Sequence, residues 1–258
     1  MRGGPELRAQ YLEALGIDRY VSRQSSAPAA AIATAAAPMI PVAPRTSAAA
    51  PDSVPARTAS PAASDPRWEP LAAEVRACTK CGLHASRTQT VFGVGDRHAE
   101  LLVVGEAPGA DEDLQGEPFV GRAGQLLNSM LRAMRAPRET VYIANVLKCR
   151  PPGNRDPAPE EVRCCLPYLQ RQIELIAPRL MLAVGRIAAQ NLLATDTPIA
   201  KLRGAVHRFG TQGTPLIVTY HPAYLLRSPG QKRQSWIDLR FVQRELARLR
   251  ATARAVEG

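Results

Sequence analysis

Five cysteines are the residues whose type and spacing most clearly indicate chemistry. Cys78 and Cys81 are two residues apart, Cys149 lies far along the chain, and Cys164 and Cys165 are adjacent. A CxxC pair with two distant cysteines supplies four thiolates, which suits tetrahedral zinc or an iron–sulfur cluster. A lone CxxC is also typical of a redox pair, and a single cysteine is often just a small buried residue. Taken together they favour a metal site. Spacing alone does not distinguish zinc from an iron–sulfur cluster, nor does it show whether Cys164 or Cys165 is the ligand.

The charge of the chain indicates a polyanionic partner. The sequence has 33 Lys and Arg against 23 Asp and Glu, a formal charge of +10. Residues 1–66 contribute about +1 of this, so residues 67–258 carry about +9. Such an excess favours nucleic acid or an anionic membrane over a neutral metabolite, although ordinary solvated arginines are the alternative.

Cysteine content and hydropathy bear on the compartment. Five unevenly spaced cysteines are too few for a secreted disulfide scaffold. No apolar run approaches the roughly 20 residues of a membrane span. We therefore expect a cytoplasmic protein without a membrane segment.

The composition predicts three segments. In residues 7–15 the apolar residues have helical spacing and Gly16 is a plausible stop, which predicts a short helical head over residues 1–23. Residues 24–66 contain 16 alanines, 8 prolines and no aromatic residue. They cannot bury enough apolar surface to offset the entropy of ordering, which predicts a disordered linker. Residues 67–258 are expected to form one folded domain, and we expect the head to dock a protein partner.

Within residues 67–258, strand-like and helical patterns alternate. This alternation predicts βαβ units and a mostly parallel sheet covered by helices on both faces. The predicted strands are residues 101–105, 141–146, 180–184 and 216–220, and the predicted helices are residues 125–134, 160–176, 186–193 and 231–250.

Polar segments follow each predicted strand. In parallel sheets the working site lies outside the carboxyl ends of the strands. The four segments at that edge have more polar chemistry than a plain turn requires; they begin GEAPGADED, NVLKCRPP, GR and HPAYLL.

Five motifs together resemble those of the type-4 uracil-DNA glycosylases, iron–sulfur members of the uracil-DNA glycosylase superfamily. The motifs are CTKCGL at residues 78–83, GEAPGADED at 105–113, QGEPFVGRAGQLL at 115–127, NVLKCRPPGNRDP at 145–157 and HPAYLLR at 221–227. The resemblance covers residues 71–249. It implies an α/β fold, a four-stranded parallel sheet in an α/β/α sandwich. It also implies hydrolysis of the N-glycosidic bond of uracil in DNA, which leaves an abasic site.

The resemblance implies a cofactor as well. It places a [4Fe-4S] cluster on Cys78, Cys81, Cys149 and Cys165. Cys164 is then a spare residue, helical and half-buried.

A uracil pocket is also implied, because a glycosylase must extrude the base and recognise its edge. Asn145 is expected to accept a hydrogen bond from uracil N3–H and to donate one to O4, a pattern that cytosine inverts. Phe119 is expected to stack on the base, and Gly105 and Gly109 to line the pocket. Gly109 stands where better-known relatives carry a tyrosine that blocks a 5-methyl group. Thymine rejection must therefore come from elsewhere or be weaker.

Three further residues are expected to act in catalysis. By resemblance, Glu106 holds or activates the attacking water and stabilises positive charge on the sugar, and His221 donates to uracil O2. Asn154 helps to position the water. Outside the motifs, an exposed turn residue would be the ordinary interpretation of Glu106 or His221.

The remaining implied residues contact DNA. Leu225, Leu226 and Arg227 resemble a loop that wedges into the duplex and contacts phosphate. Lys148 and Arg150 are further candidates for contacts with the DNA backbone, and solvated charge is the alternative for both.

Two other functions remain open at this point. One is a non-catalytic or covalent binder of uracil-containing or abasic DNA within the same superfamily, although the basic, His-containing insertion of the covalent binders is absent after Asn145. The other is a zinc DNA-binding module. The expected partner is uracil-containing DNA, which would associate the protein with the nucleoid, and we expect a monomer.

Overall fold

The computed structural model describes residues 65–257 of the 258-residue chain. The predicted head at residues 1–23 lies outside the described residues. So does the predicted linker, apart from Asp65 and Pro66.

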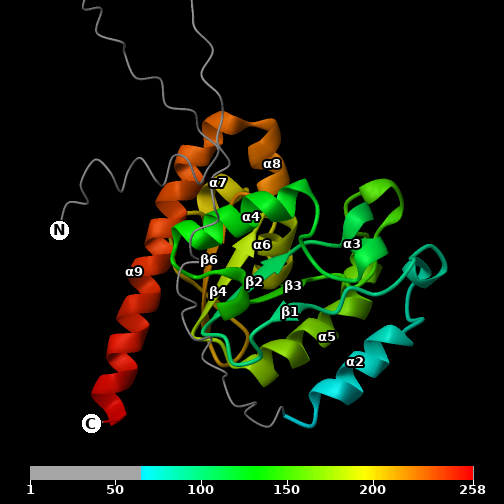
Figure 1. The fold of residues 1–258 in the computed structure, drawn as a ribbon, viewed down its shortest axis with the longest axis horizontal. Helices are drawn as coiled ribbons and strands as arrows, with labels where there is room; N and C mark the ends of the chain where they lie inside the picture. Colours follow the sequence, from blue (N-terminus) through cyan, green and yellow to red (C-terminus); the bar gives the residue numbers. More distant parts are fainter. Residues whose placement is uncertain (1–64, 258) are drawn as a thin grey trace, which may run out of the picture. The chain divides into compact units, whose positions relative to one another are not determined.

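A six-stranded mixed sheet forms the centre of the domain (Figure 1). Its order is β1-β3-β2-β4-β6-β5, with four parallel strands in the middle and one short antiparallel strand at each edge. The strands are β1 (Val94–Gly95), β2 (Leu101–Gly105), β3 (Tyr142–Asn145), β4 (Leu180–Val184), β5 (His207–Phe209) and β6 (Thr214–Thr219).

The predicted parallel strands are confirmed, but the predicted count of four is wrong. The two additional strands, β1 and β5, have two and three residues. Such short segments are too brief to show the alternation of apolar and polar residues by which a strand is recognised in sequence. Their pairing depends on the neighbouring strand rather than on a pattern of their own.

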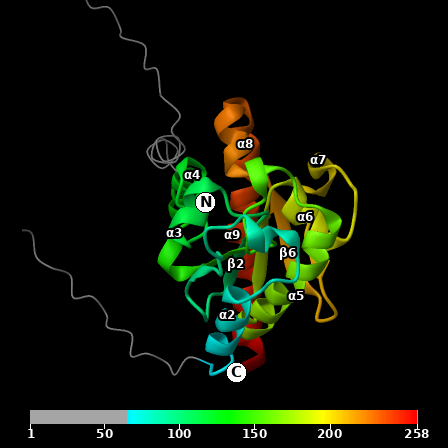
Figure 2. The ribbon, with the colours of Figure 1, turned by 90° about the vertical axis from the view of Figure 1, so that its right-hand side faces the viewer.

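Helices cover both faces of the sheet (Figures 1 and 2). Along β2, Leu102 and Val104 face one core cluster, and Leu101 and Val103 face the other. This alternation produces an α/β/α sandwich. The first cluster includes α2 (Trp68–Arg76), α5 (Pro159–Ile176), α6 (Arg186–Leu193) and α7 (Ile199–Leu202), and the second includes α4 (Arg122–Ala133), α8 (Pro222–Arg227) and α9 (Lys232–Glu257).

The long helices agree with the sequence pattern. The prediction for residues 186–193 matches α6, and α5 begins one residue earlier than predicted. α4 begins at Arg122, three residues early, because its first turn carries no apolar signal. The short helices α2, α7, α8 and α3 (Ala110–Gln115) were not predicted. Single turns of 3₁₀-helix lie at Gly82–Ala85, Arg138–Thr140, Pro152–Asn154 and Pro229–Gln231.

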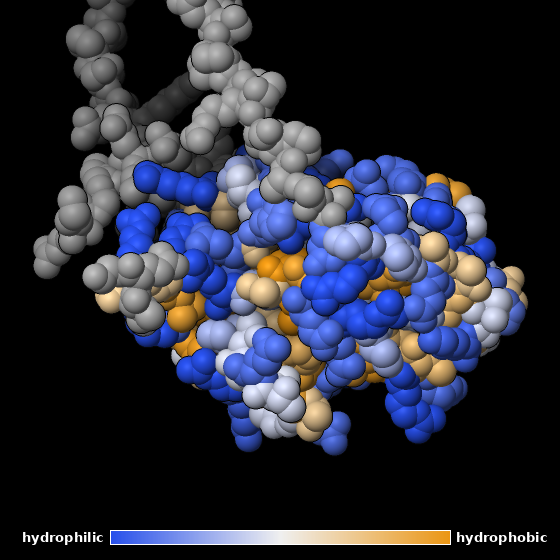
Figure 3. All heavy atoms as spheres, turned by 90° about the horizontal axis from the view of Figure 1, so that it is seen from below, coloured by the Kyte–Doolittle hydropathy of each residue, from blue (hydrophilic) through white to orange (hydrophobic). Residues whose placement is uncertain are grey.

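One face of the domain is mainly polar. Figure 3, seen from below relative to Figure 1, shows hydrophilic side chains over most of this face with smaller hydrophobic areas between them. Within residues 65–257, every helix is too short or too polar to cross a membrane.

Candidate active site and cysteine pocket

A cavity of about 720 Å³ lies at the carboxyl ends of the parallel strands. Each of the four central strands places a residue on it, at its last position or one or two residues beyond: Glu106 after β2, Asn145 on β3, Gly185 after β4 and His221 after β6. This is the edge at which parallel sheets bind ligands. Of the predicted site residues, those that line the cavity are Glu106, Gly109, Phe119, Asn145, Asn154, His221 and Arg227.

Asn145 is a buried polar side chain with an unused acceptor. Its side chain lines the cavity and the residue is 2% exposed, yet no group in the described part of the chain hydrogen-bonds to its Oδ1. Gly105 is its register partner on β2. A Cβ atom on Gly105 would overlap Asn145 Oδ1 and lie 2.6 Å from Cζ of Phe119. Buried polar atoms are almost always paired, so this oxygen indicates a site for an external donor.

Phe119 is held in a strained conformation beside Asn145. Its φ of 55° lies in the left-handed region, which costs about 1–3 kcal/mol and persists only where the surroundings enforce it. Arg138 Nη2 donates to the Pro118 carbonyl at 2.6 Å. On the other side, the Glu112 carboxylate accepts the N–H of Val120 at 3.0 Å. Glu112 was not identified from the sequence, although it lies inside the GEAPGADED motif.

His221 presents a neutral imidazole to the cavity. Its ring lies 5.7 Å from the Phe119 ring, centroid to centroid. Its Nδ1 accepts the backbone N–H of Ala223 at 3.1 Å, so in the neutral ring the proton resides on Nε2. Burial, with the nearby Arg227 charge, lowers the pKa of His221 to about 4. The ring is therefore uncharged at neutral pH and can donate from Nε2.

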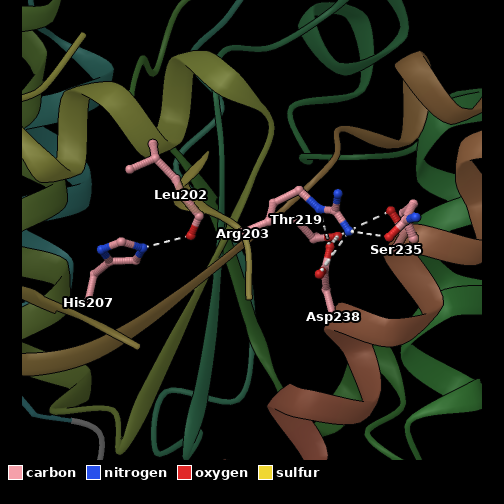
Figure 4. A network of polar contacts seen from close by, with 7 residues as sticks. Leu202, Arg203, His207, Thr219, Ser235 and Asp238 are labelled. Atoms are coloured by element: carbon pink, nitrogen blue, oxygen red, sulfur yellow. Dashed lines mark hydrogen bonds and ion pairs between the residues drawn. The ribbon is translucent and has the colours of Figure 1, made fainter. Parts of the chain in front are cut away.

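A buried polar network fixes the end of β6 just before His221 (Figure 4). Asp238 of α9 accepts from Arg203 Nε at 2.7 Å and Nη2 at 3.0 Å. It also accepts from Thr219 Oγ1 at 2.8 Å, and that oxygen lies 3.2 Å from Ser235 Oγ. Removing one partner of a buried ion pair typically costs about 3–5 kcal/mol. This network therefore anchors the strand that delivers His221.

Glu106 has an environment that favours its neutral form. Burial, helped by the Asp156 carboxylate, raises the pKa of Glu106 to about 7, while Arg186 acts in the opposite direction. Arg186 and Asp156 form an ion pair at 2.6 Å. Neither was assigned a role from the sequence. The GR after the third predicted strand was the only signal for Arg186.

Asn154 and Gly109 line the cavity, and each forms a hydrogen bond with another residue of the chain. Asn154 has a φ of 55° and its Oδ1 accepts from Arg150 Nε at 2.8 Å. Gly109 caps α3, and its N–H donates to Glu112 at 3.0 Å. A Cβ on Gly109 would lie 2.6 Å from that carboxylate oxygen, so a larger residue would displace the Glu112 carboxylate.

The structure contradicts two of the predicted DNA contacts. Lys148 is 1% exposed, so its ammonium cannot reach a phosphate, and that prediction is wrong. Leu225 is fully buried, because the HPAYLLR segment forms helix α8, whose apolar side packs into the core. Leu225 is therefore not a wedge. Leu226, 37% exposed, and Arg227 remain at the surface.

The cysteines gather at a second, smaller pocket. Arg87 Nη1 donates to Cys149 Sγ at 3.1 Å, and the Lys148 backbone N–H donates to Cys165 Sγ, also at 3.1 Å. The Cys164 thiol instead donates to a backbone carbonyl at 3.3 Å. All five thiols line the pocket: Cys78, Cys81, Cys149, Cys164 and Cys165.

The chemistry of this pocket suits thiolates bound to metal. Burial raises the pKa of Cys165 to about 12, so the free thiol keeps its proton. Thiolates are the metal-binding form, and the cations Arg87 and Lys148 at the pocket would stabilise them. No carboxylate is among the described residues that line it. In residues 65–257, no three His, Cys, Asp or Glu side chains are close enough to hold one metal ion.

Known proteins resemble this chain over most of its described residues. Residues 92–241 match the sequence model of the uracil DNA glycosylase superfamily. A type-4 uracil-DNA glycosylase of Archaeoglobus fulgidus is 48% identical over 175 residues, 66% of this chain and 88% of that protein. A type-4 enzyme of Thermotoga maritima is 45% identical over 162 residues, 62% and 83% of the two chains. A type-5 uracil-DNA glycosylase of Thermus thermophilus is 31% identical over 182 residues, 62% and 81%.

Proposed function

The chain belongs to the uracil-DNA glycosylase superfamily, in its type-4 branch, and we propose that it hydrolyses the N-glycosidic bond of uracil in DNA. The products are free uracil and an abasic site, which makes the protein an enzyme of base excision repair. The observation that carries the proposal is the unpaired, buried Oδ1 of Asn145, on a cavity shared with an aromatic ring and a neutral imidazole.

Asn145 recognises the edge of the extruded base. Its Oδ1 accepts from uracil N3–H, and its Nδ2 donates to O4. Cytosine has an unprotonated N3 and an amino group at C4, so the same orientation would oppose acceptor to acceptor and donor to donor. Leaving such buried groups unpaired costs about 1–3 kcal/mol each, which supports rejection of cytosine. Gly105 leaves the space that this side chain and Phe119 require.

Phe119 and His221 act on the base from its face and its O2 edge. Phe119 stacks on the ring from the cavity wall, where its backbone is held with a φ of 55°. As the glycosidic bond breaks, negative charge accumulates on the leaving uracil. His221 Nε2–H donates to O2 and stabilises this charge. Removing a preorganised donor of this kind typically lowers the rate about 10²–10³-fold.

Glu106 acts on the sugar and the water. Its ionised carboxylate accepts a hydrogen bond from the attacking water and stabilises positive charge on the deoxyribose. Asn154, which also lines the cavity, positions that water. The neighbouring pair of Asp156 and Arg186 adjusts how easily Glu106 ionises.

The edge of the cavity faces the DNA. Leu226 is exposed on α8 and takes the wedging role that buried Leu225 cannot. Arg227 and Arg150 contact phosphates on either side of the extruded nucleotide. The excess positive charge of residues 67–258 supports association with DNA through its backbone.

The cysteine pocket would hold a [4Fe-4S] cluster through Cys78, Cys81, Cys149 and Cys165. Bound there, the cluster supplies a covalent cross-link between the loop after α2, the loop after β3 and α5. A cluster suits four thiolates because each of its irons takes a thiolate of its own. Cys164, bonded to a backbone carbonyl, is the spare residue.

Uracil release from a defined oligonucleotide tests the function, with iron and sulfide measured on the same preparation. The wild-type protein should release uracil, and Asn145→Ala should lower the single-turnover rate by at least about 10²-fold because recognition of the edge is lost. Asn191→Ala is a matched control, since Asn191 lies on α6 and outside the cavity lining.

Each other outcome supports a different function. Wild-type protein with a full cluster that releases no uracil would contradict the proposal. Tight, uracil-dependent binding without base release would indicate a non-catalytic DNA binder instead. Zinc without inorganic sulfide would indicate a zinc DNA-binding module.

A further inference from the structure

Lys148 is a buried cation placed between the two sites. Its Nζ donates to the Asn145 backbone carbonyl at 2.8 Å and to Gln172 Oε1 at 2.6 Å. Lysine is almost never fully buried unless its charge is paired. Among residues 65–257, no carboxylate forms an ion pair with it. Its charge must therefore be balanced by another kind of group.

The cysteine pocket supplies that balance. Lys148 lines the same pocket as the Cys149 and Cys165 thiols. The Lys148 backbone N–H also donates to Cys165 Sγ at 3.1 Å. Metal-bound thiolates in this pocket would carry the negative charge that the buried ammonium lacks. One residue thus contacts the cysteine pocket through its backbone and the carbonyl of Asn145 through its side chain.

Gln172 holds the ammonium in a fixed position. It is fully buried on α5, and its Nε2 donates to the Phe92 carbonyl at 2.9 Å. The amide is therefore oriented with Oε1 toward Lys148. Since α5 also carries Cys165, the acceptor and the thiol belong to one rigid element.

The segment between Asn145 and Lys148 also holds the catalytic loop. Val146 N–H donates to the Gly105 carbonyl and Leu147 N–H donates to the Glu106 carbonyl, both at 3.0 Å. Any shift of this segment would move Asn145 and Glu106 together. A displacement of about 1 Å in a catalytic group can cost about 10²-fold in rate.

We propose that Lys148 is a positioning residue that holds Asn145 in its uracil-recognising orientation and couples this orientation to the cysteine pocket. The inference rests on the proposed function. The ammonium fixes the Asn145 carbonyl, and with it the direction of the side chain that carries the unpaired Oδ1. Metal-bound thiolates in the cysteine pocket would balance its charge.

Substitution by methionine tests the role, since methionine has a similar length but no charge and no donor. Lys148→Met is compared with Lys80→Met, which makes the same change at an exposed lysine on the same pocket. For each variant we would measure the visible absorbance of the cluster, single-turnover uracil excision, binding of free uracil, and affinity for undamaged duplex against salt.

Lys148→Met with its cluster intact should excise uracil about 10–100-fold more slowly and bind free uracil more weakly. Its affinity for undamaged duplex and the salt dependence of that affinity should match the wild type. A lysine that contacted phosphate would instead weaken binding to all DNA and reduce the salt slope by about 1. A purely structural lysine would lower the melting temperature without changing excision well below it.

Each result decides the matter. If wild type releases uracil and Lys148→Met behaves as Lys80→Met, this inference fails and the proposed function stands. If the wild-type protein releases no uracil, the proposed function fails, and the inference that rests on it fails as well. Should Lys148→Met not fold, Gln172→Met removes one of the two acceptors that hold the ammonium. Gln172→Met should then lower the excision rate and the affinity for free uracil by a smaller factor, with unchanged affinity for undamaged DNA. Wild-type excision together with wild-type uracil binding would overturn the inference.

Discussion

At the scale of single residues, the cavity holds two ionisable side chains that burial shifts in opposite directions. Burial raises the pKa of Glu106 to about 7 and lowers that of His221 to about 4, because in each case the charged form is disfavoured. Between these values His221 is neutral, whereas Glu106 gains its charge only near neutrality. Divergent environments of this kind separate the roles of two groups in one site.

The pH dependence of excision follows from Glu106. If catalysis requires its carboxylate, the single-turnover rate should rise about tenfold per unit below pH 7 and level off above it. His221 contributes no inflection near pH 7, since it is already neutral there. Rates measured between about pH 5 and pH 9 test this, with Glu106→Gln as the control that should be slow and lack the inflection. A wild-type rate that falls as the pH rises through 7 would contradict the assignment.

At the scale of elements, helix α5 separates two adjacent cysteines. Consecutive residues on an α-helix point about 100° apart. Cys165 therefore lies on the buried side with Tyr168 and Leu169, while Cys164 stays half-exposed at the rim of the same pocket. The same logic applies on α8, where burial of Leu225 leaves the next residue at the surface.

The cysteine doublet thus offers a matched pair of variants. Cys165→Ala should lose most iron and sulfide, because one of the four proposed thiolates is missing. Cys164→Ala should keep the wild-type content and the wild-type excision rate. Metal and sulfide analysis of both proteins decides between them, and the reverse pattern would make Cys164 the ligand.

At the scale of the whole molecule, the cavity, the cysteine pocket and most of the positive charge all belong to residues 67–258. The family match also lies within this segment, at residues 92–241. The segment therefore contains the proposed catalytic machinery. Residues 1–66 are proposed to act as a docking head on a linker.

Deletion of residues 1–66 tests this division. The truncated protein should excise uracil from a short oligonucleotide at the full-length rate, because none of the proposed site residues is removed. The measurement is a single-turnover rate at matched cluster content. A large loss of activity would show that the head or linker takes part in excision rather than in tethering.

Patterns that are local in the sequence predicted much of this structure. The central strands are apolar runs long enough to be recognised, and α6 matches its predicted bounds because its apolar residues repeat with helical spacing. Asn145, Glu106 and His221 were placed at one edge because parallel strands bring their carboxyl ends together. The edge strands, the short helices and the partners of Glu106 have no such periodic signal.

The sequence by itself determined three features of this protein. These are the four parallel strands, the polar residues that follow each of them, and a set of thiols suited to binding metal. Only the tertiary structure decided which of these side chains are buried. Lys148 and Arg150 are two basic residues in one motif, yet one is enclosed between Asn145 and Gln172 while the other reaches the surface. Burial depends on neighbours that are distant in the chain, such as α5 for Lys148 and α4 for Leu225. No local pattern in the sequence indicates these contacts.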